Sequence, residues 1–129
     1  MNIKVIVLAA IIGLSTPTVM DISNSHPVLA AQQRFDYPNG TFGDQEWSIT
    51  LNYSDYTYSY SGANQHTGSN IYIDSQPKLS GNRQRQMYIW KNGQHRYQVT
   101  WRPKDPDFIR VQVISPNGKE ILNRLLPKQ

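Results

Sequence analysis

The sequence contains no cysteine, and this absence excludes three classes of small protein. Disulfide-linked miniproteins, cysteine-type zinc modules and iron–sulfur carriers all need thiol or thiolate groups. Long apolar runs are missing as well. The single uninterrupted run, residues 5–14, is shorter than the roughly 20 residues of a membrane-spanning helix, which excludes a multi-span membrane protein. No repeat with a period of about 20–50 residues is present, which excludes propellers and solenoids.

Residues 1–30 have the pattern of a secretory signal peptide. Lys4 supplies a positive charge, the apolar run of residues 5–14 follows it, and the segment ends in Val-Leu-Ala, which suits a signal peptidase. We therefore expect an exported protein of the periplasm or the extracellular space. The alternative is an uncleaved N-terminus that lies at a membrane interface. Residues 31–129 are expected to form a single β-domain, of which residues 31–45 can be irregular.

Aromatic residues dominate the rest of the chain and follow a β-strand pattern. The sequence has three Trp and eight Tyr beside eight Gly and eight Pro, which favours a turn-rich β-protein. Residues 47–53 and 56–60 both alternate apolar and polar side chains, as half-buried strands do. A two-residue turn at residues 54–55 would join them and place Tyr53 opposite Tyr56.

Asn92-Gly93 is the strongest hairpin signal in the sequence. Both positions of a type I′ turn need a positive φ, and Asn-Gly meets that need best. This turn would place Tyr88 opposite Tyr97 and gather the aromatic rings of both strands on one face. A later hairpin is expected around Pro116-Asn117-Gly118, with the register of its second strand left open.

Sequential hairpins of this kind predict an all-β fold. We expect a small antiparallel meander of about six to eight strands, either closed as a barrel or folded as a sandwich. The aromatic side chains would fill the interior, because strict alternation is typical of core positions rather than of an aromatic ligand platform. Tyr60 and Tyr72 are the two tyrosines most suited to line a small pocket at one end of the fold.

The second face of the Asn92-Gly93 hairpin is basic and is the best candidate for a binding surface. Residues 75–129 carry eleven Lys or Arg against three acidic residues, whereas residues 31–74 carry one Arg against five. Arginine engages phosphate, sulfate and carboxylate groups through its two-pronged guanidinium. The alternative is an ordinary solvated sheet face whose charge maintains solubility. The candidate binding residues are Arg85, Arg96, Arg102, Lys91, Met87 and Ile89.

No catalytic, metal-binding or cofactor-binding residues are assigned. His66 lies among hydroxyl residues, but no acidic partner completes a catalytic triad. His95 is expected to be a hydrogen-bonded structural residue near a hairpin tip. Asp105 and Asp107 lack the Gly and the bidentate acid of a calcium loop. We therefore expect a protein that is not an enzyme.

Residues 87–113 carry a resemblance to known proteins. The pattern Tyr-x-Trp-x-Asn-Gly, then Tyr-x-Val-x-Trp-x-Pro and an Ile-Arg-Val-x-Val strand, resembles small exported bacterial β-domain proteins without an assigned activity. A more distant likeness is to the exported β-barrel inhibitors of lysozyme. Those inhibitors carry cysteines, which this chain lacks. The resemblance implies an exported β-domain and no particular chemistry.

These observations lead to one functional expectation and one alternative. We expect a non-enzymatic exported or envelope domain that binds an anionic polymer or headgroup through the basic hairpin face. The expected partners are an anionic polysaccharide or a membrane surface, and nucleic acid is not expected for an exported protein. The alternative is a protein-interaction or hydrolase-inhibitor module, which would bind an envelope protein through residues 61–70 or through a strand edge.

Overall fold

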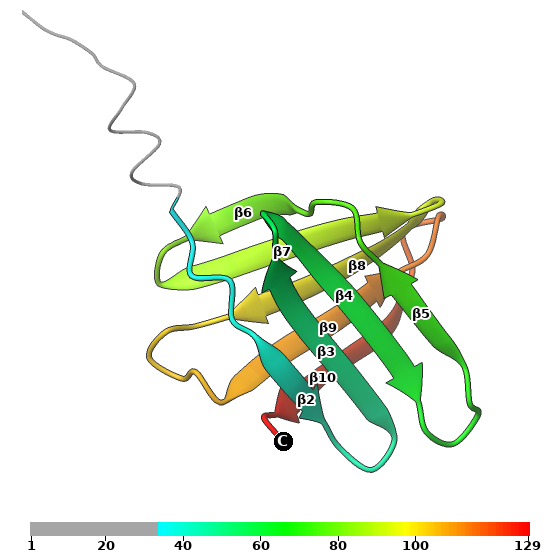
Figure 1. Ribbon diagram of the computed structural model, residues 1–129. Coiled ribbons are helices and arrows are strands. Elements are labelled where there is room, and N and C mark those ends of the chain that lie inside the picture. Colours follow the sequence, from blue (N-terminus) through cyan, green and yellow to red (C-terminus); the bar gives the residue numbers. More distant parts are fainter. Residues whose placement is uncertain (1–33) are drawn as a thin grey trace, which may run out of the picture. The chain divides into compact units, whose positions relative to one another are not determined.

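The computed structural model describes residues 34–129, which form nine β-strands and contain no helix (Figure 1). The all-β prediction is confirmed. The predicted signal peptide, residues 1–30, lies outside the described residues. The strands are β2 (Gly40–Gly43), β3 (Trp47–Ser54), β4 (Thr57–Asn64), β5 (Asn70–Ile73), β6 (Lys78–Asn82), β7 (Arg85–Asn92), β8 (His95–Trp101), β9 (Phe108–Ile114) and β10 (Glu120–Pro127).

The strands form two separate antiparallel meanders, and each strand pairs with its neighbours in sequence. One sheet has the order β2-β3-β4-β5, and the other has the order β10-β9-β8-β7-β6. Both sheets contribute to one hydrophobic cluster, so they pack face to face as a sandwich (Figure 1). Of the two closures that the sequence left open, the structure has the sandwich rather than the barrel.

The strand number exceeds the expected six to eight, and β6 is a strand for which the sequence pattern gave little indication. Leu79 pairs with Tyr88 across the β6–β7 ladder and is partly buried against the core. A single inward apolar side chain between polar neighbours is a weak sequence signal for a strand. Pairing with β7 supplies the backbone hydrogen bonds that the sequence pattern alone does not reveal.

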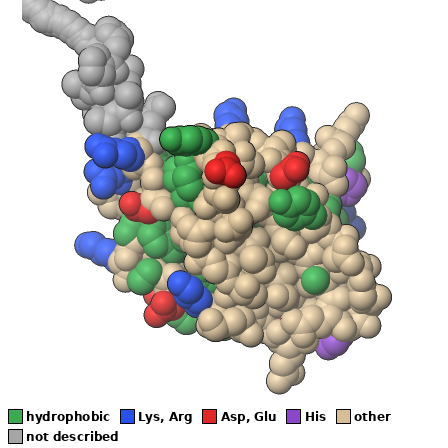
Figure 2. Space-filling model, viewed as in Figure 1, with side chains coloured by type: hydrophobic (Ala, Val, Ile, Leu, Met, Phe, Trp, Pro, Cys, Tyr) green, Lys and Arg blue, Asp and Glu red, His purple; other side chains and the backbone are tan. Residues whose placement is uncertain are grey.

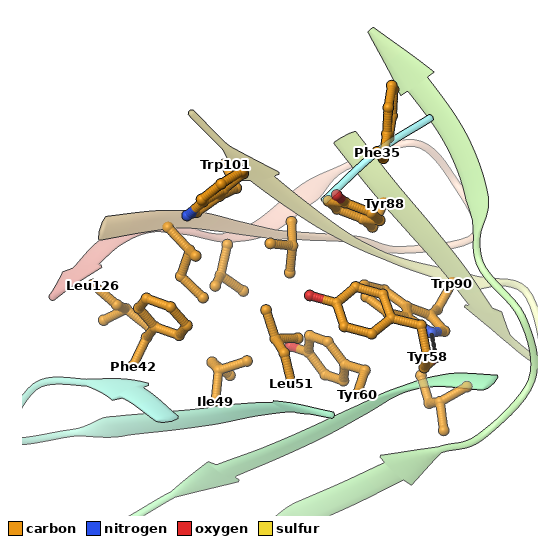
Figure 3. Packing of buried hydrophobic residues seen from close by; sticks show 14 residues of the cluster. Phe35, Phe42, Ile49, Leu51, Tyr58, Tyr60, Tyr88, Trp90, Trp101 and Leu126 are labelled. Carbon is orange, nitrogen blue, oxygen red and sulfur yellow. Dashed lines mark hydrogen bonds between the residues drawn. The ribbon is translucent and has the colours of Figure 1, made fainter. Parts of the chain in front are cut away.

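The core lies between the sheets and is built largely from aromatic rings, as the alternation predicted (Figure 3). Tyr58, Tyr88 and Trp90 are completely buried, and Tyr60 is 2% exposed. The rings of Tyr58 and Tyr88, which belong to different sheets, meet edge to face with their centroids 5.0 Å apart. Such edge-to-face pairs stabilise a core by roughly 0.5–1.5 kcal/mol beyond the area that they bury.

The Asn92-Gly93 hairpin forms, but its register differs from the prediction by two residues. Asn92 pairs with His95 and Trp90 pairs with Tyr97, so the turn consists of Gly93 and Gln94. Of these two residues only Gly93 has a positive φ, of 62°. This matches a type II′ turn, which needs glycine only at its first central position.

The first predicted hairpin is shifted in the same way. Tyr53 pairs with Tyr58 rather than with Tyr56, and the turn consists of Asp55 and Tyr56. These two residues have φ values of 53° and 62°, as a type I′ turn requires. A shift of two residues keeps the side chains of the paired strands on their predicted faces, so most of the predicted core is correct although both registers are wrong. Tyr53 and Tyr56, which lie beside and in the turn, are 37% and 83% exposed instead.

The final hairpin resolves the register that the sequence left open. A bulge between Glu120 and Leu122 sets β10 so that Leu122 pairs with Val113. Leu122 and Leu126 consequently point toward the core, whereas Leu125 points outward and is 51% exposed.

Candidate functional site: an arginine pocket on the five-stranded sheet

The predicted basic face exists as the outer face of the five-stranded sheet. Arg85, Met87, Ile89 and Lys91 alternate with buried residues along β7, and the register places Met87 opposite Thr100 and Lys91 opposite Arg96. Met87 and Ile89 are half-buried, because neighbouring side chains on the same sheet face partly cover them. The four predicted basic residues are exposed: Arg85, Lys91, Arg96 and Arg102.

The structure divides these basic residues into two groups. Arg85 and Arg102 line a pocket of about 270 Å³ on this face, whereas Lys91 and Arg96 form a pair near the Gly93 turn and do not line it. We refer to this cavity as the arginine pocket. Its lining residues are Arg85, Thr100, Arg102, Asp105, Phe108, Arg110 and Leu125.

Arg110 is the main residue that the sequence reasoning missed. It lies between the buried Ile109 and Val111, so its outward direction could be read from the alternation of β9. Its position in the pocket follows from two pairings, with Thr100 in β8 and with Leu125 in β10. Only the strand order of the sheet brings these residues together.

Arg85 is held at the pocket by the buried residue beside it. Gln86 is completely buried, and its side-chain amide donates hydrogen bonds to Asp36 Oδ2 and to the carbonyl of Arg83, both at 2.8 Å. Its amide oxygen accepts hydrogen bonds from the hydroxyl of Tyr88 and the backbone N–H of Asp36. Because neighbouring side chains of a strand point to opposite faces, a fixed inward Gln86 fixes an outward Arg85.

The loop of residues 102–107 forms one wall of the arginine pocket. The N–H of Asp105 donates to the carbonyl of Arg102 at 3.0 Å, which closes a turn. The indole N–H of Trp101 donates to the carbonyl of Pro106 at 3.1 Å and ties the loop to the sheet. These bonds place Arg102 and Asp105 at the rim of the pocket.

Thr100 lies in the pocket wall with a hydroxyl that has no hydrogen-bond partner among the described residues. The residue is 7% exposed. A buried hydroxyl without a partner costs about 1–3 kcal/mol, so such groups are rare without a reason. An acceptor atom of a ligand in the pocket would remove this cost.

The arginine pocket has an excess of positive charge. It contains three arginines and one acidic residue, Asp105. Within residues 34–129 the ion pairs involve only Arg124, which contacts Asp44 and Glu46 at 3.0 and 3.1 Å. The pocket arginines therefore form no ion pair among the described residues; Arg110 donates a hydrogen bond to Asn123 Oδ1 at 2.8 Å, a neutral partner that leaves its positive charge uncompensated.

The outer face of the four-stranded sheet has a different character. Its side chains are mostly hydroxyls and amides, and Thr41 and Thr50 share a hydrogen bond of 2.9 Å between their hydroxyl oxygens. Figure 2 shows this face, on which uncharged side chains predominate and basic groups lie near the margin. The basic side chains are thus concentrated on selected surfaces rather than distributed evenly over the domain.

No group of three or more His, Asp or Glu side chains within residues 34–129 is arranged to hold a metal ion. His66 lies in a loop organised by Asn64, whose side-chain oxygen accepts hydrogen bonds from the N–H groups of His66 and Thr67. These hydrogen bonds explain the conformation of the loop that contains His66.

Comparison of the chain with protein-family models, with curated proteins and with solved structures finds no match. Among residues 34–129 there is also no helix with the length and apolarity needed to cross a membrane.

Proposed function

We propose that this protein is a non-enzymatic exported domain that binds an anionic group in the arginine pocket. The observation that carries the proposal is the combination of three arginines with the buried, unpartnered hydroxyl of Thr100 around one cavity. The ligand group is a phosphate, sulfate or carboxylate, because guanidinium groups and a hydroxyl all donate hydrogen bonds to such oxygens.

The rim of the arginine pocket indicates what else the ligand carries. Phe108 and Leu125 line the pocket and are 37% and 51% exposed. Exposed large apolar side chains beside a charged pocket favour a ligand whose anionic group is attached to an apolar or ring-shaped body. A lipid headgroup and a sulfated or phosphorylated polysaccharide both have this chemistry, and both occur where an exported domain would act.

Binding rather than catalysis is favoured by the lining residues. A hydrolase would need a nucleophile beside a base, and the seven described lining residues include no His. Thr100, the one hydroxyl residue in the lining, lacks a hydrogen-bonded base that would activate it. The alternative function, a protein-interaction or hydrolase-inhibitor module, requires a partner protein rather than an anion.

Two double variants with equal loss of charge test the site. Arg85→Gln/Arg110→Gln removes two arginines from the pocket, and Lys91→Gln/Arg96→Gln removes two cations from the same face outside it. Binding to phosphatidylglycerol vesicles and to dextran sulfate should fall at least about tenfold in the pocket variant, because a hydrogen bond to a charged group contributes about 1.5–3 kcal/mol. The control variant should lose much less. Equal losses in both variants would show diffuse surface attraction and would contradict the proposed pocket.

The same experiment separates the possible sources of the anion. Preference for phosphatidylglycerol over phosphatidylcholine vesicles, without retention on dextran sulfate, identifies a headgroup ligand, and the reverse result identifies a polymer. Binding should weaken as salt is added, because exposed charges are screened within about 8–10 Å at physiological ionic strength. Stoichiometric, salt-insensitive capture of a single envelope protein, with no anion binding, would instead support the interaction module.

Thr100→Val provides a second test, in which stability should increase while the affinity for the anion decreases. Valine has a similar shape and needs no hydrogen bond, so the variant should be more stable than the wild type by about 1 kcal/mol. It should nevertheless bind the anion less tightly, because the hydroxyl donor is lost. A variant that is stabilised and binds with unchanged affinity would remove Thr100 from the site.

A further inference from the structure

A second cavity, of about 300 Å³, lies between the two sheets. We call it the intersheet pocket. One wall comes from β3, β4 and β5, and the other comes from β8, β9 and β10. Its lining residues are Trp47, Tyr60, Gly62, Ser69, Asn70, Ile71, Tyr97, Val113, Ile121 and Leu122.

The intersheet pocket borders a core position of β4 that is occupied by glycine. Tyr58 and Tyr60 point into the core, and alternation places residue 62 on the same face, opposite Ile49 in β3 and Ile71 in β5. A Cβ atom on Gly62 would lie 3.2 Å from Tyr60 Cε1 and 3.3 Å from Ile49 Cδ1. The side chains of Tyr60 and Ile49 therefore close over this position, so Gly62 lines the intersheet pocket where even a methyl group would be crowded.

The apolar residues around the intersheet pocket remain partly exposed. Trp47, Ile71, Tyr97 and Leu122 are four of the six partly buried hydrophobic residues that pack against the core, and all four line the intersheet pocket. Ile121, also in the lining, is 54% exposed. Contact between water and these apolar side chains is unfavourable, so an apolar ligand that displaced the water would be stabilised in the pocket.

One polar group lies in the apolar wall of the pocket. Tyr60 is 2% exposed and is a lining residue. Its hydroxyl oxygen lies 3.4 Å from the position that a Cβ of Gly62 would take, which places it beside another lining residue. Burial raises the pKa of this phenol, so it remains a hydrogen-bond donor.

We propose that the intersheet pocket binds a small, uncharged, apolar molecule that accepts one hydrogen bond from the hydroxyl of Tyr60. The charge of the lining argues for this occupant, because none of the ten lining residues is Asp, Glu, Lys, Arg or His. A dry apolar cavity of about 150 Å³ holds benzene in another protein. The intersheet pocket is about twice that size, which suits a fused two-ring molecule. This inference does not depend on the arginine pocket.

The first test uses the uncharged fluorescent probe N-phenyl-1-naphthylamine. Its emission should rise when it binds the wild-type protein, with energy transfer from Trp47 that is reduced in Trp47→Phe. Leu122→Trp places a larger ring in the intersheet pocket and should weaken binding at least about tenfold. Leu125→Trp, the same substitution on the opposite face of β10, is the matched control and should bind as the wild type does.

The second test concerns the hydroxyl. The ketone 2-acetylnaphthalene should bind more tightly than naphthalene by about fivefold, the effect of one additional hydrogen bond. Tyr60→Phe keeps the ring and should abolish this preference without changing the affinity for naphthalene. An equal preference in both proteins would exclude Tyr60 as the donor.

A measurement on the wild-type protein covers the case in which Leu122→Trp does not fold. Methyl NMR signals of Ile71, Val113 and Leu122 should shift on addition of the probe, while those of Ile89 and Leu125 should not. Absence of any such shift at the solubility limit of the probe would overturn the proposal, as would unaltered probe binding by a folded Leu122→Trp variant. Arg85→Gln/Arg110→Gln should bind the probe normally, which separates this site from the arginine pocket.

Discussion

The indole N–H of Trp90 donates a hydrogen bond of 2.9 Å to the backbone carbonyl of Tyr58, and this bond joins the two sheets through the buried core (Figure 3). β5 ends at Ile73, opposite Tyr60, so it does not reach Tyr58. The backbone N–H of Tyr58 is also satisfied by a side chain and donates to Gln76 Oε1 at 2.9 Å. Side chains thus replace the ladder hydrogen bonds that the short β5 cannot provide.

Trp90→Phe should destabilise the domain by about 2–4 kcal/mol, because it leaves a buried carbonyl without a donor and creates a small cavity. Trp101→Phe is the matched control. Its indole donates to the carbonyl of Pro106, which lies in an exposed loop and can accept from water instead, so a loss of only about 1 kcal/mol is expected. Urea unfolding of both variants measures the difference. Equal losses of unfolding free energy would show that the hydrogen bond between the sheets contributes no more to stability than the hydrogen bond from Trp101 to Pro106.

Asp44 should make the stability of the domain depend on acidic pH. Its pKa is held below the ordinary value of 3.8, chiefly by the hydrogen bond from the N–H of Trp47, with further contributions from the N–H of Glu46 and from Arg124. A carboxyl with a lowered folded-state pKa stabilises the fold above its unfolded pKa, and this contribution disappears as the pH falls below that value.

The neutral substitution Asp44→Asn tests this expectation. It keeps an oxygen that can accept both backbone hydrogen bonds but removes the titrating charge. The wild type should be the more stable protein at neutral pH, and the difference should shrink once the pH falls below 3.8. Unfolding midpoints in urea across this range provide the measurement. A difference that does not change with pH would contradict the assignment.

Three buried tyrosines should limit the stability of the domain at alkaline pH. Burial raises the pKa of Tyr58, Tyr60 and Tyr88 well above the ordinary value of 10.0. In the unfolded chain these phenols ionise near their ordinary pKa. The stability of the folded domain is therefore unaffected by their ionisation below that pKa and decreases as the pH rises above it. Tyrosinate absorbance and circular dichroism, followed together, should show these phenols ionising only as the sheet signal disappears. Their ionisation in an intact fold would contradict this account.

Two glycines with positive φ should respond differently to the same substitution. Gly93 has a φ of 62° and open space around a Cβ, so Gly93→Ala should cost only the backbone strain of about 1–2 kcal/mol. Gly81 has a φ of 83°, and a Cβ there would lie 2.2 Å from the carbonyl oxygen of Arg85. Gly81→Ala must therefore move the backbone, and its cost in unfolding free energy should exceed that of Gly93→Ala.

Gly81→Ala should also weaken anion binding, because the displaced backbone carries Arg85, a wall residue of the arginine pocket. Gly93→Ala should leave anion binding unchanged, because the Gly93 turn lies away from that pocket. Titration of both variants with phosphatidylglycerol vesicles compares them directly. Normal anion binding by a destabilised Gly81→Ala protein would show that the position of Arg85 tolerates this movement.

The face of each residue could be predicted from the sequence more reliably than its partner. Alternation placed Tyr88 and Trp90 in the core and Arg85 outside it, and all three are found there. The paired residues were wrong by two positions in both central hairpins, because the turn type depends on which residues adopt a positive φ. At residues 55–56 this conformation falls on Asp and Tyr, a pair that no turn rule favours.

In the candidate sites, too, the face of a residue could be predicted more readily than its neighbours. The outward direction of Arg85 and Arg102 could be expected, but Arg110 joins them only because β9 lies beside β8. The strand predicted at residues 56–60 ends before Gly62, whereas β4 continues to Asn64, and the cavity that Gly62 lines depends on which side chains face it from the other sheet.

The order of side chains along each strand is a local property with a period of two residues, so the amino-acid sequence alone determined the all-β class, the aromatic core and the basic face. The contents of the two pockets were decided by the tertiary structure. Each pocket is lined by residues from strands far apart in the chain, and their meeting depends on sheet order, register and the packing of one sheet on the other. These are long-range relationships, which hydrophobic periodicity within a single strand does not encode.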